Sequence, residues 1–523
     1  MLGMDQDERR DNEGTYMAIS TKQAWQTLQG LPKPALAALF DGNADRVDQF
    51  SVRFELEENG LLFDCSKMHL DTAHIAAFEA LAQAADFDAA RERLLTGEIV
   101  NPTENRAAEH TAQRGIGNPE SVERALGYHS RMAAVVEAIH GGAMGEVKHL
   151  IHVGIGGSAL GPALAVDALT RDGVMVDVHI VSNVDGTALQ RAFAACDPQT
   201  TMLAVASKTF TTIETMTNAA SVIDWMKENE VPDPYGKVVA LSASQERAIE
   251  WGIDETRVLP FAESVGGRYS LWSSIGFPVA MALGWPDYAE MLEGAAAMDE
   301  HFANSDGADN IPLRAAFADQ YYTRLRGAET RAVFAYDERL KLLPDYLQQL
   351  EMESNGKAVK MDGTAVDGPT APITWGGVGT DAQHAVFQLL HQGTHLVPTE
   401  FIASIVPGHD LDDEHHRILL SNCFAQGAAL MAGRQSDDPA RSYPGDRPSA
   451  TILIDDLTPA AFGALIAFYE HRTFANAVLM GINPFDQFGV ELGKDIARQI
   501  EAGDTTFDPA TEALLARVGL GKT

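Results

Sequence analysis

The sequence predicts an α/β protein: a doubly wound domain, with helices covering a parallel sheet, followed by a second α/β domain. From about residue 147, short β-rich runs alternate with helical stretches. This alternation is typical of βαβ units. A second series of the same kind follows a helical stretch at 287–326. The length of 523 residues is sufficient for at least two sizeable cores.

The first series predicts about five parallel strands with helices between them. The expected strands lie at residues 147–154, 176–183, 201–207, 237–243 and 257–261. The helices between them are expected at residues 158–169, 187–195, 212–227 and 245–251. Short apolar runs bounded by helices in this way indicate strands buried in a sheet.

The second series begins with a strand and ends in a helical C-terminal third. We expect a strand at 330–336, helices at 338–350 and 381–391, and a strand at 399–406. The first hundred residues look mainly helical. One strand pair is expected near residues 51–66, where Asn59-Gly60 is a hairpin turn signal.

The charge balance excludes two classes of partner. Lys plus Arg number 39 against 74 Asp plus Glu, a net charge of −35. Nucleic acids and anionic membranes need a basic face, so we expect neither as a partner. A phosphorylated substrate would need local donors such as the N–H groups of a helix N-terminus. No run of 18 or more apolar residues occurs and the start lacks the apolar region of a secretory signal, so we expect neither a membrane span nor such a signal. The odd number of widely spaced cysteines fits a reducing cytoplasm.

The spacing of the cysteines and histidines in the sequence does not indicate a metal site. Cys65, Cys196 and Cys423 are far apart and odd in number, so we expect buried free thiols. The segment from Asp410 to His416 has the composition of a metal site but no recognisable ligand spacing, which favours a solvated loop. We therefore predict no metal and no cofactor.

A glycine-rich segment, VGIGGSALGP at residues 153–162, lies where a strand ends and a helix begins. Its glycines, Gly157 among them, bring backbone N–H groups close to a ligand, and Ser158 adds a hydroxyl. Two other interpretations stay open. The spacing also fits a dinucleotide fingerprint with Asp185 as the ribose-binding acid, or a tight turn without a ligand.

A second polar segment, SKTFTTIE at residues 207–214, has the composition of an anion-binding cradle. It contributes the hydroxyls of Ser207, Thr209 and Thr212 and the charge of Lys208 at a helix start. Thr211 and Glu214 have capping-box spacing. A capped helix after a polar turn is the alternative, but this density of hydroxyls exceeds what capping needs.

Two segments carry candidate catalytic groups. In VGGRYS, Arg268 follows two glycines and could present its guanidinium to a phosphate or a developing enediolate oxygen. In MESNGK, Asn355-Gly356 ends a helix and leaves Glu353 in its last turn, where the negative helix end disfavours the charged form. Such a carboxylate suits a general base. A surface arginine and a solvated glutamate are the alternatives.

Two further candidates are a histidine and a lysine. Thr380 and Gln383 have capping-box spacing, which places His384 in the first turn of a helix from about Asp381, where imidazole tends to be neutral. An ordinary histidine is the alternative. In FDQFGVELGK at residues 485–494, two glycines near Lys494 would let a buried helix pack closely.

In this order and spacing, these segments resemble the glucose-6-phosphate isomerase family along nearly the whole chain from about residue 17. FDQFGVELGK matches one family signature at every defined position, and VGGRYSLWSSIG matches the other. The resemblance implies two unequal three-layer αβα sandwich domains with parallel-type central sheets (the sugar-isomerase fold), helical N- and C-terminal arms and a homodimer. The implied segments are a disordered extension (1–16), a mainly helical segment packing on the large domain (17–114), a small domain (115–285) and a large domain with the C-terminal arm (286–523).

The resemblance also implies the reaction, which is the reversible interconversion of glucose 6-phosphate and fructose 6-phosphate in glycolysis and gluconeogenesis. Glu353 would move a proton between C1 and C2 of the open-chain sugar, and Arg268 would stabilise the cis-enediolate. His384, contributed across the dimer interface, and Lys494 would assist ring opening. The implied phosphate-binding residues are Gly157, Ser158, Ser207, Lys208, Thr209 and Thr212, with Gln487 nearby. Isomerisation by an enediolate needs a base, an oxyanion stabiliser, a ring-opening group and a phosphate anchor, but no metal.

Two rival functions remain. A nucleotide-dependent oxidoreductase would use the glycine fingerprint at residues 154–159, but it leaves the other segments unexplained. A non-catalytic sugar-phosphate sensor would bind without turnover, yet every implied catalytic position is filled.

Overall fold

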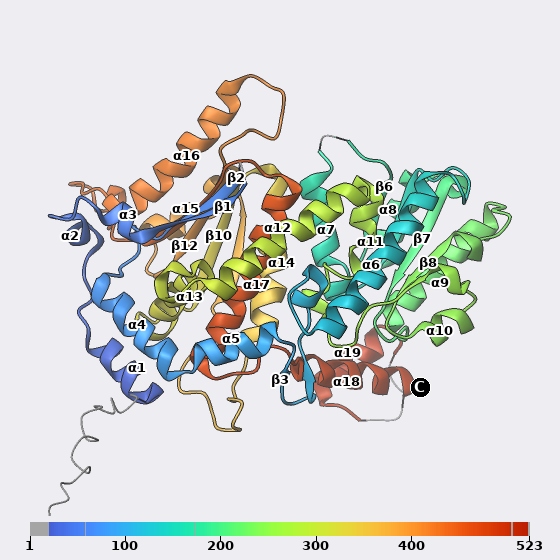
Figure 1. Cartoon of the computed structure of the whole chain (residues 1–523), viewed down its shortest axis with the longest axis horizontal. Coiled ribbons are helices and arrows are strands. Elements are labelled where there is room, and N and C mark those ends of the chain that lie inside the picture. The colour runs from blue at the N-terminus through green and yellow to red at the C-terminus, as the bar shows by residue number, and fades with distance from the viewer. Residues whose placement is uncertain (1–19, 58, 172, 504–505, 521–523) are drawn as a thin grey trace, which may run out of the picture.

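The structure is a computed structural model that describes residues 20–57, 59–171, 173–503 and 506–520. The extension expected at residues 1–16 lies outside the described residues. Two sheets organise the chain, one of five strands in the order β6-β5-β7-β8-β9 and one of six in the order β1-β2-β13-β12-β10-β11. Figure 1 shows them side by side, each with its helices. The predicted α/β class with parallel-type sheets is confirmed.

The five-stranded sheet is entirely parallel, as expected. Its strands are β5 (His149–Val153), β6 (Asp177–Val181), β7 (Thr201–Ala206), β8 (Val238–Leu241) and β9 (Val258–Leu259). Successive side chains point to opposite faces. Ile151 and Leu203 pack in a cluster with residues of α8 (Gly186–Ala195) and α9 (Ile213–Glu228). Leu150 and Met202 join the larger core on the other face.

The helices α6, α7 and α11 cover the face of the five-stranded sheet that carries Leu150 and Met202. A further helix, α10, follows β8 in the chain. Their bounds are α6 (Pro119–His140), α7 (Leu160–Leu169), α10 (Gln245–Glu250) and α11 (Phe277–Leu283). Because parallel strands place all their carboxyl ends at one edge, the loops after β5, β7 and β9 meet there.

The six-stranded sheet combines both ends of the chain. Its parallel part contains β10 (Thr330–Tyr336), β11 (Ile373–Val378), β12 (Thr399–Ser404) and β13 (Ser449–Ile454). An N-terminal hairpin of β1 (Ser51–Leu56) and β2 (Asn59–Asp64) adds to β13 in antiparallel fashion. Leu56 pairs with Asn59, so the turn lies between them. Asn59-Gly60 therefore begins β2 and does not form the turn, because the Asn59 side chain binds Asp456 and Thr458 instead.

Three helices lie at the centre of the molecule, where two of them pack against the third, α17. They are α12 (Trp285–Asn304), α13 (Ile311–Gln320) and α17 (Pro459–Met480), and every residue of α17 from Ala461 to Met480 is buried. α12 and α17 pack closely because a Cβ on Gly294 would lie 1.9 Å from the Ala460 carbonyl oxygen. The buried charges of α17 are paired, since Arg472 binds both Asp319 and Glu400.

The remaining elements surround these layers. They are α1 (Thr21–Gly30), α2 (Leu36–Phe40), α3 (Arg46–Phe50), α4 (Thr72–Ala84), α5 (Phe87–Leu95), β3 (Ile99–Asn101), β4 (Arg106–Ala107), α14 (Leu343–Leu347), α15 (Asp381–Gln392), α16 (Asp413–Ala432), α18 (Glu491–Ala502) and α19 (Pro509–Arg517). In Figure 1, α16 projects from the body of the molecule, and α18 and α19 lie beside the five-stranded half. The helix predicted at 338–350 is instead a short 3-10 turn, α14 and a π-helix, Gln348–Glu353.

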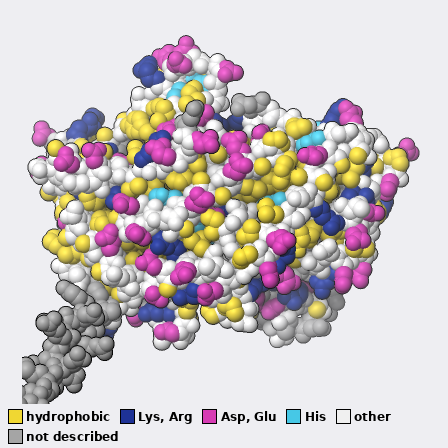
Figure 2. Space-filling model, viewed as in Figure 1, with side chains coloured by type: hydrophobic (Ala, Val, Ile, Leu, Met, Phe, Trp, Pro, Cys, Tyr) yellow, Lys and Arg dark blue, Asp and Glu magenta, His cyan; other side chains and the backbone are white. Residues whose placement is uncertain are grey.

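The surface is rich in acidic side chains. Acidic side chains are scattered over the whole visible face in Figure 2, as the net charge of −35 requires. Within the described ranges, no helix has both the length and the apolar character needed to cross a membrane.

Candidate active site

A cavity of about 1020 Å³ lies between the π-helix and the segment that leads into α18. Glu353, the last residue of the π-helix, lines it together with Lys357. Gln487 and Phe488 line it from the segment before α18. The cavity therefore joins two of the sequence segments that were singled out as carrying chemistry.

Arg268 and Glu353 meet at this cavity. Nη1 of Arg268 lies 3.1 Å from Oε1 of Glu353. The Arg268 side chain is 2% exposed, whereas the Glu353 side chain is 18% exposed. The carboxylate thus faces the open space, and the guanidinium is fixed behind it.

The remaining contacts of Arg268 hold its plane in one orientation. Nε donates to Ser354 Oγ at 2.7 Å and Nη1 donates to Gln487 Oε1 at 2.9 Å. Nη2 donates to the backbone carbonyls of Pro484 and Asp486. All three nitrogens are engaged, and such a forked arrangement fixes geometry as well as charge.

The glycine-rich loop after β5 lies directly against the arginine segment. Arg268 sits on the short 3-10 helix Gly267–Tyr269 that follows β9. A Cβ on Gly157 would lie 2.1 Å from the Gly267 carbonyl carbon and 2.5 Å from the Arg268 nitrogen. Ser158 closes the 3-10 turn Gly156–Ser158, just before α7. The two segments can approach this closely because residue 157 has no side chain.

The predicted anion cradle surrounds the start of α9. Ser207 Oγ and Thr212 Oγ1 lie 3.1 Å apart and share a hydrogen bond. Thr209 Oγ1 and Thr211 Oγ1 share another at 2.8 Å. Thr212 is the N-cap residue but forms no side-chain cap within the described chain. The first N–H groups of this 16-residue helix are therefore available to an anion.

Lys208 connects the cradle to the segment of Arg268. Its Nζ donates to the carbonyl of Val265 at 3.3 Å and to that of Glu263 at 2.5 Å. Burial, followed by the repulsion of Arg106, lowers the pKa of Lys208 to about 8. The ammonium is thus held by carbonyl oxygens, which orients it at the junction of the two loops.

Two predicted capping boxes do not form. α9 begins after Thr212, so Thr211 is not the cap, and its hydroxyl binds Thr209 instead. α15 does begin at Asp381 as expected, but Thr380 makes no side-chain cap within the described chain. The Gln383 side chain accepts a hydrogen bond from the Tyr336 hydroxyl at 2.6 Å instead.

His384 and Lys494 lie away from the other candidates in the single chain. His384 is exposed on α15 and lines a separate hollow of about 560 Å³, together with Phe387 and His391. Lys494 is exposed on α18, a helix that has no buried residue. The expectation of a buried, closely packed helix is therefore wrong, because the added Cβ atoms of Gly489 and Gly493 would meet no atom within 4 Å.

Lys357 is a site residue that sequence reasoning did not single out. Its Nζ donates to the carbonyls of Glu353 at 2.9 Å and Asp486 at 2.6 Å, and it lies 3.1 Å from Asp486 Oδ1. Burial lowers its pKa, and Asp486 opposes that shift. Its place within MESNGK was the available signal, since the i+4 position brings a side chain back over the last helical turn.

The histidine-containing segment that was expected to be a solvated loop is only partly one. In the segment Asp410–His416, His416 Nε2 donates to the Ile405 carbonyl at 2.8 Å. Only its first part is a loop, because α16 begins at Asp413 after the N-cap Asp412. Elsewhere, Cys196 lies beside His149 and His179, a grouping that the sequence spacing did not indicate.

Comparisons with known proteins agree with this geometry. The family model described as phosphoglucose isomerase matches residues 64–515. A glucose-6-phosphate isomerase of Erythrobacter litoralis is 67% identical, with 96% of this chain and 100% of that protein aligned. One from Novosphingobium aromaticivorans is 68% identical over 95% of this chain and 98% of that protein.

A solved structure of similar shape is that of a glucose-6-phosphate isomerase from Chlamydia trachomatis. It is 30% identical to this chain, with a TM-score of 0.87, and the alignment covers 95% of this chain and 99% of that one. Both signature segments and the Arg268–Glu353 pair fall within the matched residues. The chain therefore belongs to the phosphoglucose isomerase family.

Proposed function

We propose that this chain interconverts glucose 6-phosphate and fructose 6-phosphate through ring opening and a cis-enediolate, as a cytoplasmic enzyme of glycolysis and gluconeogenesis. The observation that carries the proposal is the pair of Arg268 and Glu353 at the cavity, 3.1 Å apart, in a chain of this family. A half-open carboxylate backed by a fixed guanidinium suits proton transfer next to a carbonyl.

In this mechanism the negative charge moves from Glu353 to a substrate oxygen, and Arg268 pairs with it in both places. Glu353 removes the proton at C2 of the open-chain aldose and becomes neutral, while the substrate oxygen gains the charge. Nη1 of Arg268, which pairs with Glu353 at the start, is then free to stabilise the enediolate oxygen. The proton of the O2 hydroxyl passes to O1, and the neutral Glu353 returns its own proton to C1, which leaves an alcohol at C1 and the carbonyl at C2. Lys357, bound to the Glu353 carbonyl, holds the end of the π-helix in place.

The phosphate of the substrate would bind at the start of α9. Ser207, Thr209 and Thr212 supply hydroxyls and the helix supplies free N–H groups. Ser158 and the N–H groups around Gly157 complete the cradle from the loop after β5. Binding energy from this remote group positions C1 and C2 against Glu353. Lys208 contributes positive charge and Gln487 lies near Arg268.

We further propose that a second copy of the chain completes each site. His384 is exposed and outside the cavity of Glu353, so the ring-opening group is missing from the site of a single chain. α18 presents exposed apolar side chains, Leu492 and Ile496, beside the exposed Lys494. A homodimer that covers these surfaces would bring His384 to the neighbouring site, and Lys494 would assist ring opening there.

The decisive experiment measures conversion of fructose 6-phosphate to glucose 6-phosphate by the wild type and by Glu353→Gln. We expect an active wild type and a loss on the order of 10³-fold in kcat for the variant, because the base is removed while the shape is kept. Glu338→Gln, an exposed carboxylate in the turn before α14, is the matched control. An inactive wild type or a nearly fully active Glu353→Gln would sink the proposal.

The rival functions are tested on the same protein. Asp185 already caps α8, since its Oδ1 accepts from the Thr187 N–H at 2.9 Å, which counts against a ribose contact. A clear rise in melting temperature with NAD or NADP would favour the oxidoreductase. Tight binding of fructose 6-phosphate without turnover would favour the sensor.

A further inference from the structure

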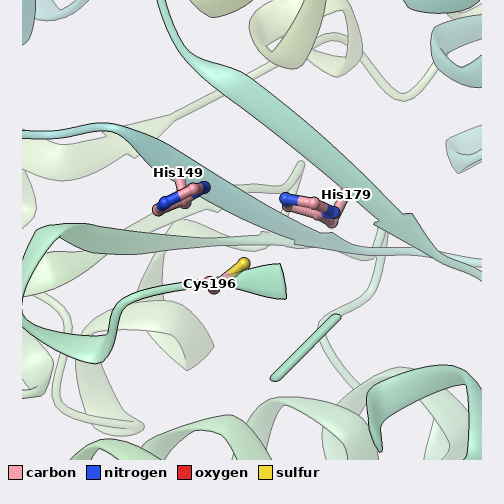
Figure 3. Close-up of side chains that lie close together, drawn as sticks. All are labelled: His149, His179 and Cys196. Carbon is pink, nitrogen blue, oxygen red and sulfur yellow. The ribbon is translucent and has the colours of Figure 1, made fainter. Parts of the chain in front are cut away.

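We infer that His149, His179 and Cys196 form a binding site for one zinc ion, with Asp177 as the fourth ligand. Figure 3 shows the two imidazole rings next to each other, with the sulfur of Cys196 pointing toward them. One nitrogen of each ring and the sulfur lie within 4.8 Å of one another. This site is independent of the proposed isomerase activity.

The strand pairing explains why these residues meet. His149 begins β5 and pairs across the sheet with Asp177, which begins β6. His179 follows Asp177 by two residues, so all three side chains point to the same face. That face is covered by α8, and Cys196 is the residue that ends α8. The sheet register and the helix end therefore build the cluster from three separate segments.

The nitrogens that face this cluster lack other partners. His149 Nδ1 and His179 Nε2 are buried and have no hydrogen-bond partner among the described residues. Asp177 Oδ2 lies 3.8 Å from the first and 3.3 Å from the second. Buried polar atoms are normally satisfied, so two unpartnered nitrogens near the same carboxylate oxygen call for a ligand.

The ligand types and their charges match zinc. Zinc binds imidazole nitrogen, thiolate sulfur and carboxylate oxygen in a tetrahedron, where neighbouring ligand atoms are about 3.5 Å apart. The spacings of 3.8 Å and 3.3 Å from Asp177 Oδ2 to the two imidazole nitrogens already have about this size. The two imidazoles and the sulfur, which lie within 4.8 Å of one another, must draw closer for one ion to bind all of them. One thiolate and one carboxylate balance the charge of Zn²⁺.

The site has an entrance and a structural role. The Asp177 side chain is 56% exposed, so an ion can reach the cluster from solvent. The cluster lies at the amino end of β5, whereas Gly154 to Ser158 follow its carboxyl end. A bound ion would join β5, β6 and the end of α8 without touching the substrate cavity.

The test measures zinc binding to the tag-free chain by calorimetry and then replaces the zinc with Co²⁺. We expect one ion per chain and, with Co²⁺, a thiolate charge-transfer band in the near ultraviolet. Cys196→Ser and His179→Ala should each weaken zinc binding at least about tenfold, and Cys196→Ser should abolish the band. Zinc should also raise the melting temperature of the wild type, an effect that magnesium should not reproduce.

Two control variants separate this site from other thiols and histidines. Cys423→Ser removes another buried cysteine. His415→Ala removes a histidine of α16 that lies near His409, in the loop before that helix. Both should bind zinc like the wild type. Absence of stoichiometric zinc binding by the wild type overturns the inference, and so does near-wild-type affinity in folded Cys196→Ser or in folded His179→Ala.

Discussion

The Cβ position of Gly157 lies 2.1 Å from the carbonyl carbon of Gly267, so only a glycine fits where the loop after β5 meets the segment of Arg268. The added Cβ of Gly157→Ala would clash with this segment, so we expect the variant to displace Arg268 from Glu353. Because small displacements of reacting groups are costly, we expect kcat/KM to fall on the order of 10²-fold. Gly127→Ala on α6, where an added Cβ meets nothing within 4 Å, is the control. Equal activities of the two variants would show that this contact does not position Arg268.

Arg268→Lys should also lose activity, although it keeps the charge. The guanidinium binds Ser354 through Nε and both Glu353 and Gln487 through Nη1, and a single ammonium cannot make all these contacts. We expect kcat to fall on the order of 10²-fold or more, with a smaller change in KM, because the lost interaction acts in the transition state. Steady-state kinetics beside the exposed control Arg417→Lys test this. A change in KM alone would contradict it.

Mixing two inactive variants should restore activity if each site uses two chains. A hybrid dimer of His384→Ala and Glu353→Gln chains contains one site with both His384 and Glu353 intact. Random exchange would give roughly a quarter of wild-type activity. Each variant subjected alone to the same exchange is the control. Confirmed hybrids without recovery would mean that each site is contained in one chain.

Lys208 should leave a signature in the pH dependence of stability. Its pKa in the folded chain is about 8, below the ordinary value of 10.5. Between these values the unfolded chain holds the extra proton, so the contribution of Lys208 to the free energy of unfolding rises with pH. Urea unfolding at about pH 7.5, 8.5 and 9.5 should show the wild type gaining on Lys208→Gln. Exposed Lys227→Gln is the control, and a constant difference for Lys208→Gln would refute the assignment.

Arg472→Met should be among the most destabilising single changes in α17. Nη2 of Arg472 lies 2.7 Å from Asp319 and Nη1 lies 2.6 Å from Glu400, with all three side chains buried. Removing the arginine takes the ion-pair partner from Glu400 and leaves Asp319 paired with Arg331 alone, which costs about 3–5 kcal/mol. The exposed Arg498–Asp495 pair is the comparison, and Arg498→Met should cost less than about 1 kcal/mol. Equilibrium unfolding that finds similar losses would contradict this.

Much of the fold was predictable because local pattern dictates it. Alternating apolar runs and helices predicted the five-stranded sheet, and the helix expected from Asp381 begins there. The hairpin was found, but its turn was misplaced. Asn59 has turn chemistry, yet its side chain is used by Asp456 and Thr458, far away in the sequence. The turn propensity of Asn59 is a local property, whereas its place in the fold depends on residues that are distant in the sequence.

The site was predictable in part. Glu353 and Arg268 stand in distinctive segments, and the structure brings them together. The sequence alone does not identify Lys357 as a site residue, since its position depends on Asp486, which is 129 residues away in the chain. The grouping of Cys196 with His149 and His179 depends on sheet register, which no sequence spacing expresses.

The N-terminal hairpin has a consequence for the order in which the chain folds. β2 pairs with β13, so residues 59–64 must wait for residues 449–454, and α17 follows later still. The five-stranded sheet needs nothing beyond residue 259 for its strands. During synthesis, this first sheet can therefore assemble while the ribosome is still working, whereas the six-stranded sheet cannot close until nearly nine-tenths of the chain has emerged. In that interval β2 lacks its partner β13, and this open edge of the hairpin is the part that a chaperone would have reason to shield.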